Sequence, residues 1–421
     1  MKKRIVCLCL VLCLALGYAP PSRASGGTLE ADGWPESETA LQDAPELTDL
    51  LPAAVRPVTG ESPLVGLAGP NVTAPAAILI ERETGLVLYE KEADTRRLPA
   101  SVTKVMTLLL VMEALDRGSM RLDEKVSISR NAHNMGGSQV FLGEGEQYTA
   151  EELVKSVVIA SGNDAAVALA EHMAGSEETF VGRMNQRAAE LGMNNTFFRD
   201  CTGLSDGDHM TTARDIAIMS RELLSHPLIK NYSTIWMDSL REGTFILNNT
   251  NKLIRFYPGA TGLKTGSTSQ ALFCLSGSAQ RDGMELIAVI LGASSSADRF
   301  DDARALLDFG FANYALAPAV TPEVTLTPVK VLLGKVSQVP VKADGQPQVL
   351  TEKGAAAGLT RAVTLAEDVA APVEAGQKLG ELTVKSGDRV LAVLPLVAAE
   401  PVAKMGLWDI YGHMMKRFFM A

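Results

Sequence analysis

The chain has 421 residues, of which 47% are apolar and 21% charged, and its formal net charge is −10. This length allows two or three domains with sizeable cores, and the composition is typical of globular proteins. The acidic balance argues against nucleic acid as a partner, because it implies no basic surface.

The first 24 residues have the pattern of a secretory signal peptide. Basic residues at positions 2–4 precede an apolar run at 5–16, and a small-x-small cleavage pattern follows at 22–24. The run is too short to indicate a membrane span, and an uncleaved N-terminal anchor is the alternative. We therefore expect residues 1–24 to be removed and the rest of the chain to be exported.

The chain has five cysteines, three of which belong to the signal segment. Cys201 and Cys274 remain, and they allow one disulfide but no disulfide scaffold. The sequence leaves open whether they pair. It contains neither a CxxC nor an HExxH motif, and its five histidines are scattered. We therefore expect no zinc site, and no metal or organic cofactor is implied.

Folded structure is expected to begin after an acidic leader. Residues 25–72 are rich in glycine, proline, alanine and acids, which favours a flexible segment. A hairpin is predicted over 74–89, where two β-rich runs flank a turn. An almost wholly apolar helix follows from Ser101.

Further elements complete an α+β domain over 73–317. A helix is expected to start at Thr149, where Glu152 completes a capping box. Two more helices are predicted at 164–173 and 177–191, the second stopped by a glycine.

The end of this domain is rich in β-forming residues. Two adjacent strands are predicted over 261–279 and 284–294, and an amphipathic helix over 297–314 closes the domain. Because strands occur at both ends of the domain, we expect one sheet to combine them.

Short alternating runs broken by glycine and proline predict a small all-β domain over 318–400. The last segment, 401–421, is predicted to be an amphipathic helix that lies in a membrane interface. Packing on its own domain and a dimer contact are the alternatives. The apolar stripe of this helix consists of Leu407, Trp408, Tyr411, Met414, Met415, Phe418 and Phe419.

A serine and a lysine stand three residues apart where the apolar helix begins, so Ser101 and Lys104 share one helical face. As structural residues they would be a helix cap and a lysine that reaches out to water. As catalytic residues they would be a nucleophile and its base, because burial lowers the pKa of a lysine and favours its neutral form. A helix N-terminus also directs backbone N–H groups toward a developing oxyanion.

Two further motifs favour the catalytic interpretation. Ser-Gly-Asn at 161–163 interrupts two predicted helices, and Lys-Thr-Gly at 264–266 opens a β-rich run. A strand can hold an extended peptide, and its lysine and threonine can bind a terminal carboxylate. The triplet at 129–131 also has the form Ser-x-Asn, but it lies too near Ser101. The order and wide spacing of the three motifs, with the export signal, make the combination specific.

With these motifs the chain resembles the low-molecular-mass penicillin-binding proteins. These serine-type D-alanyl-D-alanine carboxypeptidases, peptidase family S11, share Ser-x-x-Lys, Ser-x-Asn and Lys-Thr-Gly with serine β-lactamases. The resemblance extends to the stretch MGGSQVFLGEGE, the all-β domain and the tail. It implies a β-lactamase/transpeptidase-like catalytic domain that removes the terminal D-alanine from peptidoglycan stem pentapeptides and is inhibited by β-lactams.

The resemblance also assigns catalytic roles. It makes Ser101 the acylated nucleophile and Lys104 its base, while Ser161 passes a proton to the leaving D-alanine. Asn163 would bind the substrate amide or orient Lys104.

The remaining implied residues bind substrate. Lys264 and Thr265 would hold the C-terminal carboxylate, and the backbone N–H groups of Ser101 and Ser267 would form the oxyanion hole. Gly266 completes the third motif. Metal ligands are absent from this set.

The chain departs from its relatives at three places. Many of them carry histidine or tyrosine where this chain has Ser267, and Ala-Gly where it has Ala-Leu at 271–272. Some carry an arginine that grips the carboxylate where this chain has Asn249. These differences bear on rate and substrate preference more than on the reaction.

Three other functions are compatible with some of these motifs. A class A β-lactamase needs a Glu-x-x-Leu-Asn loop, which the stretch 190–194 resembles only loosely. A D,D-endopeptidase acting on peptidoglycan cross-links would use the same acyl-enzyme, so the sequence leaves it open. A catalytically silent wall-binding protein would keep the motifs as caps and turns, but every expected catalytic side chain is present. We expect the enzyme at the extracytoplasmic face of the cell membrane.

Overall fold

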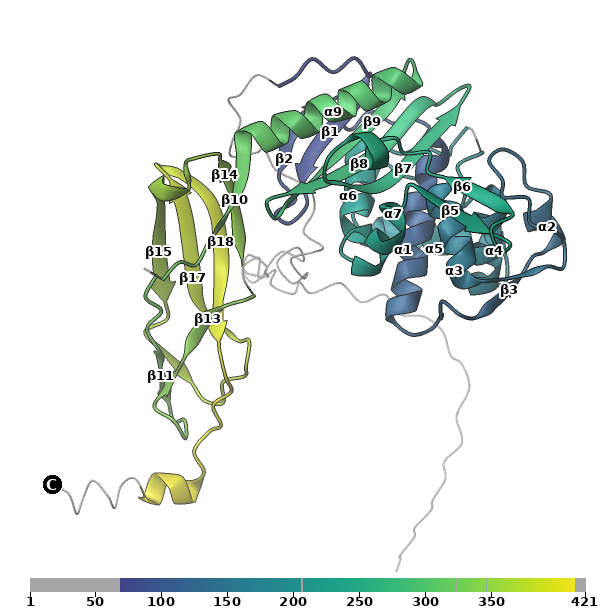
Figure 1. Ribbon diagram of the computed structural model, residues 1–421. Coiled ribbons are helices and arrows are strands. Elements are labelled where there is room, and N and C mark those ends of the chain that lie inside the picture. Colours follow the sequence, from purple (N-terminus) through teal and green to yellow (C-terminus); the bar gives the residue numbers. More distant parts are fainter. Residues whose placement is uncertain (1–68, 206, 323, 346, 413–421) are drawn as a thin grey trace, which may run out of the picture. The chain divides into compact units, whose positions relative to one another are not determined.

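The computed structural model describes residues 69–205, 207–322, 324–345 and 347–412 (Figure 1). The predicted signal peptide, most of the acidic leader and the end of the tail lie outside these residues. Those predictions therefore stay predictions.

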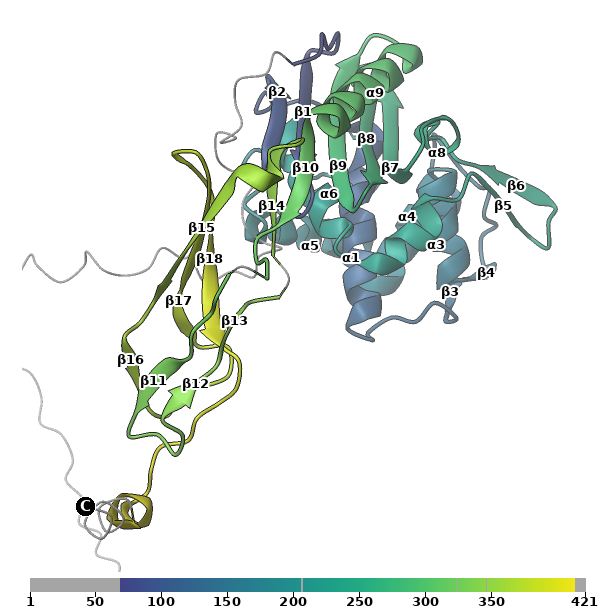
Figure 2. The same cartoon turned by 60° about the vertical axis from the view of Figure 1, so that its left-hand side comes forward.

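A five-stranded antiparallel sheet lies at the centre of the predicted α+β domain (Figures 1 and 2). Its strands are β1 (Ala76–Glu81), β2 (Val87–Lys91), β7 (Ala260–Thr268), β8 (Leu272–Arg281) and β9 (Met284–Ala293). They lie in the order β2-β1-β9-β8-β7. The first hairpin of the domain therefore pairs with its last strands, which confirms the prediction of a sheet built from both ends of the segment.

The stretch 261–279, which was predicted to be a single strand, contributes to two strands. β7 ends at Thr268, a tight turn follows, and β8 begins at Leu272. Thr268 Oγ1 accepts the N–H of Ala271 at 3.0 Å, and Leu272 takes a positive φ of 56°. The turn contains neither glycine nor proline, which are the residues that mark turns in a sequence. The prediction was wrong for that reason.

Alternate residues of β9 face opposite sides of the sheet. Ile287 and Val289 belong to the core shared with the helices of the domain. Leu286 and Ala288 pack in a second core with α9 (Ser296–Asn313), the predicted closing helix. Because both faces are covered, the strand is apolar at almost every position.

The helix predicted from Ser101 consists of two parts. A 3₁₀ turn, η3 (Ala100–Thr103), leads into α1 (Lys104–Asp116), which is buried on nearly every face. The other helices of the domain are α2 (Arg130–His133), α3 (Ala150–Ile159), α4 (Asn163–Ala174), α5 (Glu177–Glu190), α6 (Ala213–Leu223), η4 (Pro227–Ile229), α7 (Lys230–Ser233) and α8 (Leu253–Phe256).

The start of α3 has the predicted capping box. The side chain of Thr149 accepts the N–H of Glu152 at 3.2 Å, and the Glu152 carboxylate accepts the N–H of Thr149 at 2.7 Å. These bonds satisfy donors that a helix start leaves free. Two short hairpins lie beside the helices, formed by β3 (Lys125–Ser127) with β4 (Gln147–Thr149) and by β5 (Met237–Leu240) with β6 (Phe245–Asn248).

The predicted all-β domain follows α9. It contains a four-stranded sheet in the order β13-β18-β17-β15, a three-stranded sheet β12-β11-β16, and the pair β10-β14. Its elements are β10 (Tyr314–Pro318), β11 (Val329–Leu332), β12 (Gln338–Val339), β13 (Val341–Ala343), β14 (Gln348–Glu352), η5 (Ala356–Gly358), β15 (Leu359–Leu365), β16 (Asp368–Ala370), β17 (Lys378–Ser386) and β18 (Arg389–Ala398).

The described part of the tail begins with extended residues. Val402 and Lys404 form isolated β-bridges, and helical structure is seen over 407–412. The helical part therefore starts later than the predicted position 401. Leu407 and Trp408 are each 86% exposed. Over the ranges that the structure describes, every helix is too short or too polar to span a bilayer.

Candidate active site

The 3₁₀ turn η3 places the predicted nucleophile beside the predicted base. Ser101 lies inside this turn and Lys104 begins α1. Lys104 Nζ lies 3.0 Å from Ser101 Oγ. Lys104 is 0% exposed, and Pro99 rather than Ser101 occupies the N-cap position. The two residues are therefore not a helix cap and a lysine that reaches out to water.

The Lys104 ammonium group has three hydrogen-bond partners. Besides Ser101 it donates to Asn163 Oδ1 at 2.5 Å and to the Thr202 carbonyl at 2.9 Å. Burial lowers the pKa of Lys104 to about 8, although negative groups nearby, Asp200 among them, oppose the shift. Only a neutral amine can accept a proton, and this lowered pKa increases the neutral fraction of Lys104 near neutral pH.

The second motif joins α3 to α4 and faces the same lysine. Asn163 begins α4, and its amide group bonds both Lys104 and the carbonyl of Gly136, the latter at 2.6 Å. Of the two roles expected for Asn163, this geometry favours orienting Lys104. Ser161 has a positive φ of 64°, and its buried hydroxyl has no hydrogen-bond partner among the described residues. Such a group is available to a substrate.

The third motif lies on β7 against the nucleophile. A Cβ atom on Gly266 would lie 2.7 Å from the carbonyl oxygen of Pro99 and 2.9 Å from the backbone nitrogen of Ser101, so only glycine allows this approach. Lys264 is 1% exposed and donates only to the carbonyl of Thr265, at 3.0 Å, in the described chain. The hydroxyl of Thr265 contacts that of Thr250 at 2.6 Å. Ser267 is exposed.

A third buried cation, which the sequence analysis did not single out, lies beside this strand. Arg299, in the first turn of α9, donates to the carbonyl oxygens of Gly266 at 3.1 Å and Cys274 at 3.3 Å. Burial, together with the charges of Lys104 and Arg299, lowers the pKa of Lys264 well below its usual value. Among the residues that the structure describes, Lys104, Lys264 and Arg299 form no ion pair with a carboxylate. The site is therefore suited to an anionic ligand.

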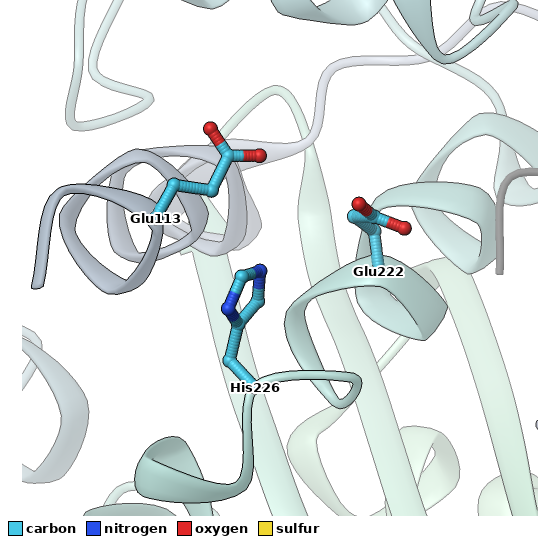
Figure 3. Close-up of side chains that lie close together, drawn as sticks. All are labelled: Glu113, Glu222 and His226. Atoms are coloured by element: carbon cyan, nitrogen blue, oxygen red, sulfur yellow. The ribbon is translucent and has the colours of Figure 1, made fainter. Parts of the chain in front are cut away.

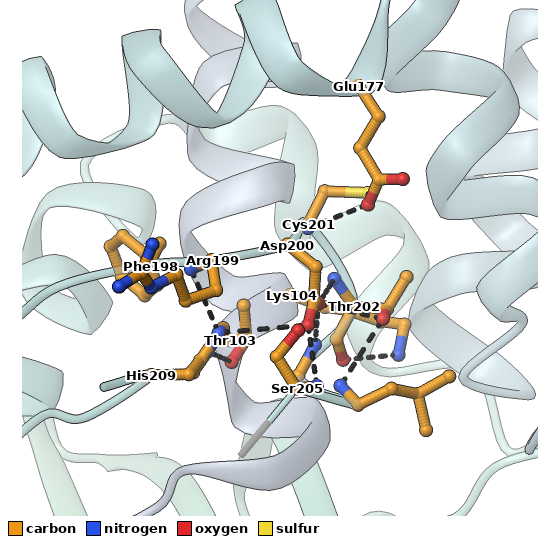
Figure 4. A network of polar contacts seen from close by, with 12 residues as sticks. Thr103, Lys104, Glu177, Phe198, Arg199, Asp200, Cys201, Thr202, Ser205 and His209 are labelled. Atoms are coloured by element: carbon orange, nitrogen blue, oxygen red, sulfur yellow. Dashed lines mark hydrogen bonds and ion pairs between the residues drawn. The ribbon is translucent and has the colours of Figure 1, made fainter. Parts of the chain in front are cut away.

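A loop between α5 and α6 supplies the carbonyl that binds Lys104 (Figure 4). The Asp200 carboxylate accepts the N–H groups of Thr202, Gly203 and Ser205 at 2.5–2.6 Å. Burial alone would raise the pKa of Asp200, but the hydrogen bonds that its carboxylate accepts from this loop lower the pKa well below its usual value. The ionised Asp200 carboxylate thus fastens the loop through three backbone hydrogen bonds.

The same loop is fastened to the nucleophile segment by His209. Its Nδ1 accepts the N–H of Arg199 at 3.1 Å, so Nε2 carries the proton and donates to Thr103 Oγ1, 2.8 Å away (Figure 4). Burial lowers the pKa of His209, which favours this neutral form. The only sequence signal for these contacts is a cluster of polar residues between two helices, and that signal is weak.

Comparisons with known proteins identify the family of this chain. The family model of D-alanyl-D-alanine carboxypeptidases, Peptidase S11, matches residues 64–295, and that of the penicillin-binding protein 5 C-terminal domain matches 322–404. The chain belongs to the D-alanyl-D-alanine carboxypeptidase family.

Curated relatives and solved structures cover most of this carboxypeptidase. D-alanyl-D-alanine carboxypeptidase DacF of Bacillus subtilis is 44% identical over 79% of this chain and 87% of its own length. DacC of Escherichia coli is 34% identical over 83% of this chain and 89% of its own length. The crystal structure of penicillin binding protein 5 from Haemophilus influenzae matches with a TM-score of 0.73 at 29% identity, covering 80% of this chain and 100% of that one. The predicted family, fold class and enzyme class are confirmed.

Glu190 was the candidate for the water-activating glutamate of a class A β-lactamase, and the structure does not place it at the active site. Glu190 ends α5, where it accepts from Gln186 at 2.9 Å and pairs with Arg187 at 3.4 Å. It is thus bound within its own helix rather than at Lys104. The discounted triplet at 129–131 is likewise structural, because Ser129 caps α2.

The structure also shows the surroundings of Asn249 and the state of the two cysteines. Asn249, which stands where some relatives have an arginine, donates to the carbonyl of Ile235 at 2.7 Å and accepts the N–H of Asn251 at 2.9 Å. Its side chain therefore holds local backbone. Cys201 and Cys274 are both buried free thiols.

Proposed function

We propose that this carboxypeptidase removes the terminal D-alanine of peptidoglycan stem pentapeptides through an acyl-Ser101 intermediate. The observation that carries the proposal is the 3.0 Å contact between Ser101 Oγ and the fully buried Nζ of Lys104, whose pKa is lowered to about 8. A serine hydroxyl attacks an amide poorly until a base removes its proton. Neutral Lys104 is the group placed to do so.

Acylation would need a base, an oxyanion hole and a proton donor for the leaving group. Lys104 takes the proton of Ser101, and Oγ attacks the carbonyl carbon of the penultimate D-alanine. The backbone N–H groups of Ser101 and Ser267 stabilise the oxyanion. Ser161, whose hydroxyl is unpartnered in the described chain, passes a proton to the leaving D-alanine nitrogen and regains one from protonated Lys104, so the peptide bond breaks and Lys104 is neutral again. An ester to Ser101 and free D-alanine result.

Deacylation would use Lys104 as the base a second time. Water enters where D-alanine has left, and neutral Lys104 accepts its proton as the hydroxide attacks the ester carbonyl. The shortened peptide leaves with a free carboxylate, and Ser101 regains its proton. Asn163 and the Thr202 carbonyl hold Lys104 in place through both steps.

Specificity for a C-terminal carboxylate would come from the buried cations. Lys264 and Thr265 lie on β7 next to the nucleophile, and Arg299 adds positive charge behind them. A substrate carboxylate would provide the counter-charge that these groups lack, which makes burial of the cations less unfavourable. β-Lactams carry a carboxylate beside a strained amide, so the same site would be acylated by them.

The decisive experiment measures D-alanine release from a pentapeptide ending in D-Ala-D-Ala. We expect release by the exported protein and none by Ser101→Ala, together with a penicillin adduct in the intact mass of the first protein alone. Ser129→Ala is the matched control, because that serine belongs to the second Ser-x-Asn triplet and only caps α2. Release that persists in Ser101→Ala would refute the assignment. Cleavage of cross-linked dimers in preference to pentapeptides would favour the endopeptidase.

We also place the enzyme at the extracytoplasmic face of the cell membrane, held by its tail. The signal-like N-terminus supports export, and the 86% exposure of Leu407 and Trp408 supports an apolar surface on the tail. Deleting 401–421 is expected to move the protein from the membrane fraction to the soluble fraction. Unchanged fractionation would contradict the anchor.

A further inference from the structure

Two acids and a histidine gather at the end of α1 that is remote from the nucleophile. Glu113 comes from the last turns of α1, Glu222 from the end of α6, and His226 follows α6 by one short loop (Figure 3). One side-chain donor atom from each of the three lies within 4.8 Å of the others. Glu113 stands nine positions after Lys104, about 13 Å along the helix axis.

Two atoms of this cluster are buried without a partner in the described chain. They are Oε2 of Glu222 and Nε2 of His226. Glu222 is only 8% exposed, and the His226 side chain only 14%. A buried carboxylate oxygen and a buried imidazole nitrogen that lack partners are costly. Both atoms are therefore available to a ligand.

The other nitrogen of His226 is fixed by an acid. Nδ1 lies 2.5 Å from Asp116 Oδ2, and because a carboxylate accepts, Nδ1 carries the hydrogen. Nε2 of the neutral ring is then left with a free lone pair. Histidines that bind metals usually donate their other ring N–H to a carboxylate in this way.

Charge in the cluster also favours a cation. Arg187 from α5 bridges the two glutamates, donating to Glu113 at 2.7 Å and to Oε1 of Glu222 at 2.8 Å. This bridge holds the two carboxylates together and leaves Oε2 of Glu222 free. The carboxylates in and around the cluster outnumber the guanidinium groups by one. The residues concerned are Glu113, Asp116, Glu190 and Glu222 against Arg117, Arg187 and Arg221.

We propose that Glu113, Glu222 and His226 bind one Zn²⁺ ion. Two carboxylate oxygens and one imidazole nitrogen are ligands that Zn²⁺ accepts at about 2.0–2.2 Å, with water completing a tetrahedron. The donors would have to move together slightly, as side chains at the ends of helices can. The histidine distinguishes this site from one for Ca²⁺ or Mg²⁺, which prefer oxygen ligands.

The ion would join the C-terminal end of α1 to α6. Since Lys104 begins α1 and the site is near its other end, Zn²⁺ would stabilise the helix pair without touching the reacting groups. Motif searches miss such a site, because the pair Glu222 and His226 is not specific by itself and Glu113 comes from a helix 109 positions earlier in the sequence.

The test uses the exported chain without a polyhistidine tag. Calorimetric titration with ZnCl₂ is expected to show one site, and His226→Gln and Glu222→Gln are each expected to weaken it by about 10- to 100-fold or more. Asp116→Asn should weaken it by about 10-fold or more through the orienting bond. His172→Gln is the matched control, because that histidine also pairs with one acid, Glu124 at 2.8 Å, but has no third ligand. It should leave the affinity unchanged.

Two further readouts separate a site from chance binding and from misfolding. Co²⁺ in place of Zn²⁺ is expected to give a visible absorption band that disappears in His226→Gln. Acylation by a fluorescent penicillin, which needs only the active site, checks that each variant is folded. Equal Zn²⁺ affinity in the wild type and in a folded His226→Gln variant would overturn the proposal, as would a wild type that binds no Zn²⁺.

Discussion

Replacing Gly203 with alanine tests how closely the Thr202 loop is fitted to the nucleophile. Gly203 has a φ of +86°, and a Cβ atom there would lie 1.8 Å from the carbonyl oxygen of Ala100. Ordinary contact begins at 3.4 Å, so the loop must retreat by about 1.6 Å. Ala100 directly precedes Ser101, and Thr202 supplies the carbonyl that holds Lys104 at 2.9 Å.

The magnitude has two parts. Alanine in the left-handed region costs about 1–2 kcal/mol, and forcing an atom into a packed contact costs about 1–3 kcal/mol more. Gly192→Ala isolates the first part, because Gly192 has a similar φ of +73° and open space around it. We therefore expect Gly203→Ala to lower the free energy of unfolding by about 1–3 kcal/mol more than Gly192→Ala does.

The assays are urea unfolding and the rate of acylation by a fluorescent penicillin. Displacing a positioning group by about 1 Å can slow a reaction by about 100-fold, so acylation of Gly203→Ala should fall strongly while that of Gly192→Ala stays near the wild-type rate. If Gly203→Ala matches Gly192→Ala in both assays, the loop is not held against Ala100, and the positioning role of Thr202 is refuted.

Acylation should rise with pH and level off above a midpoint near 8, because burial lowers the pKa of Lys104 to about 8 and only its neutral form accepts a proton; a flat profile would remove Lys104 as the base. Lys264→Gln should lower kcat/KM for the pentapeptide by about 10- to 100-fold, the value of a charged hydrogen bond, whereas the exposed Lys252→Gln should not; equal values would contradict carboxylate binding. Cys201 and Cys274 should react with a thiol reagent only after unfolding, since both are buried and burial raises the pKa of each; rapid labelling of the native enzyme would contradict this.

Features that depend on neighbouring residues were predictable from the sequence. The capping box of Thr149 and Glu152, the first hairpin and the closing helix α9 each follow from a pattern of a few turns or a few residues. The three short motifs were sufficient for the family, because their order along the chain is itself specific. The prediction missed the turn between β7 and β8. Leu272 takes a positive φ there, and no glycine indicates the turn in the sequence.

Contacts between distant segments were decided by the tertiary structure alone. Lys104 binds Asn163 and Thr202 across 59 and 98 positions of sequence, and Thr103 binds His209 across 106. Arg299 reaches Gly266 from another element. No local pattern encodes which side chains meet when a sheet closes over a helix, because that depends on packing of the whole domain. The sequence by itself determined which groups are able to react, and the folded chain decided that the lysine beside Ser101 is buried and held by the Thr202 carbonyl.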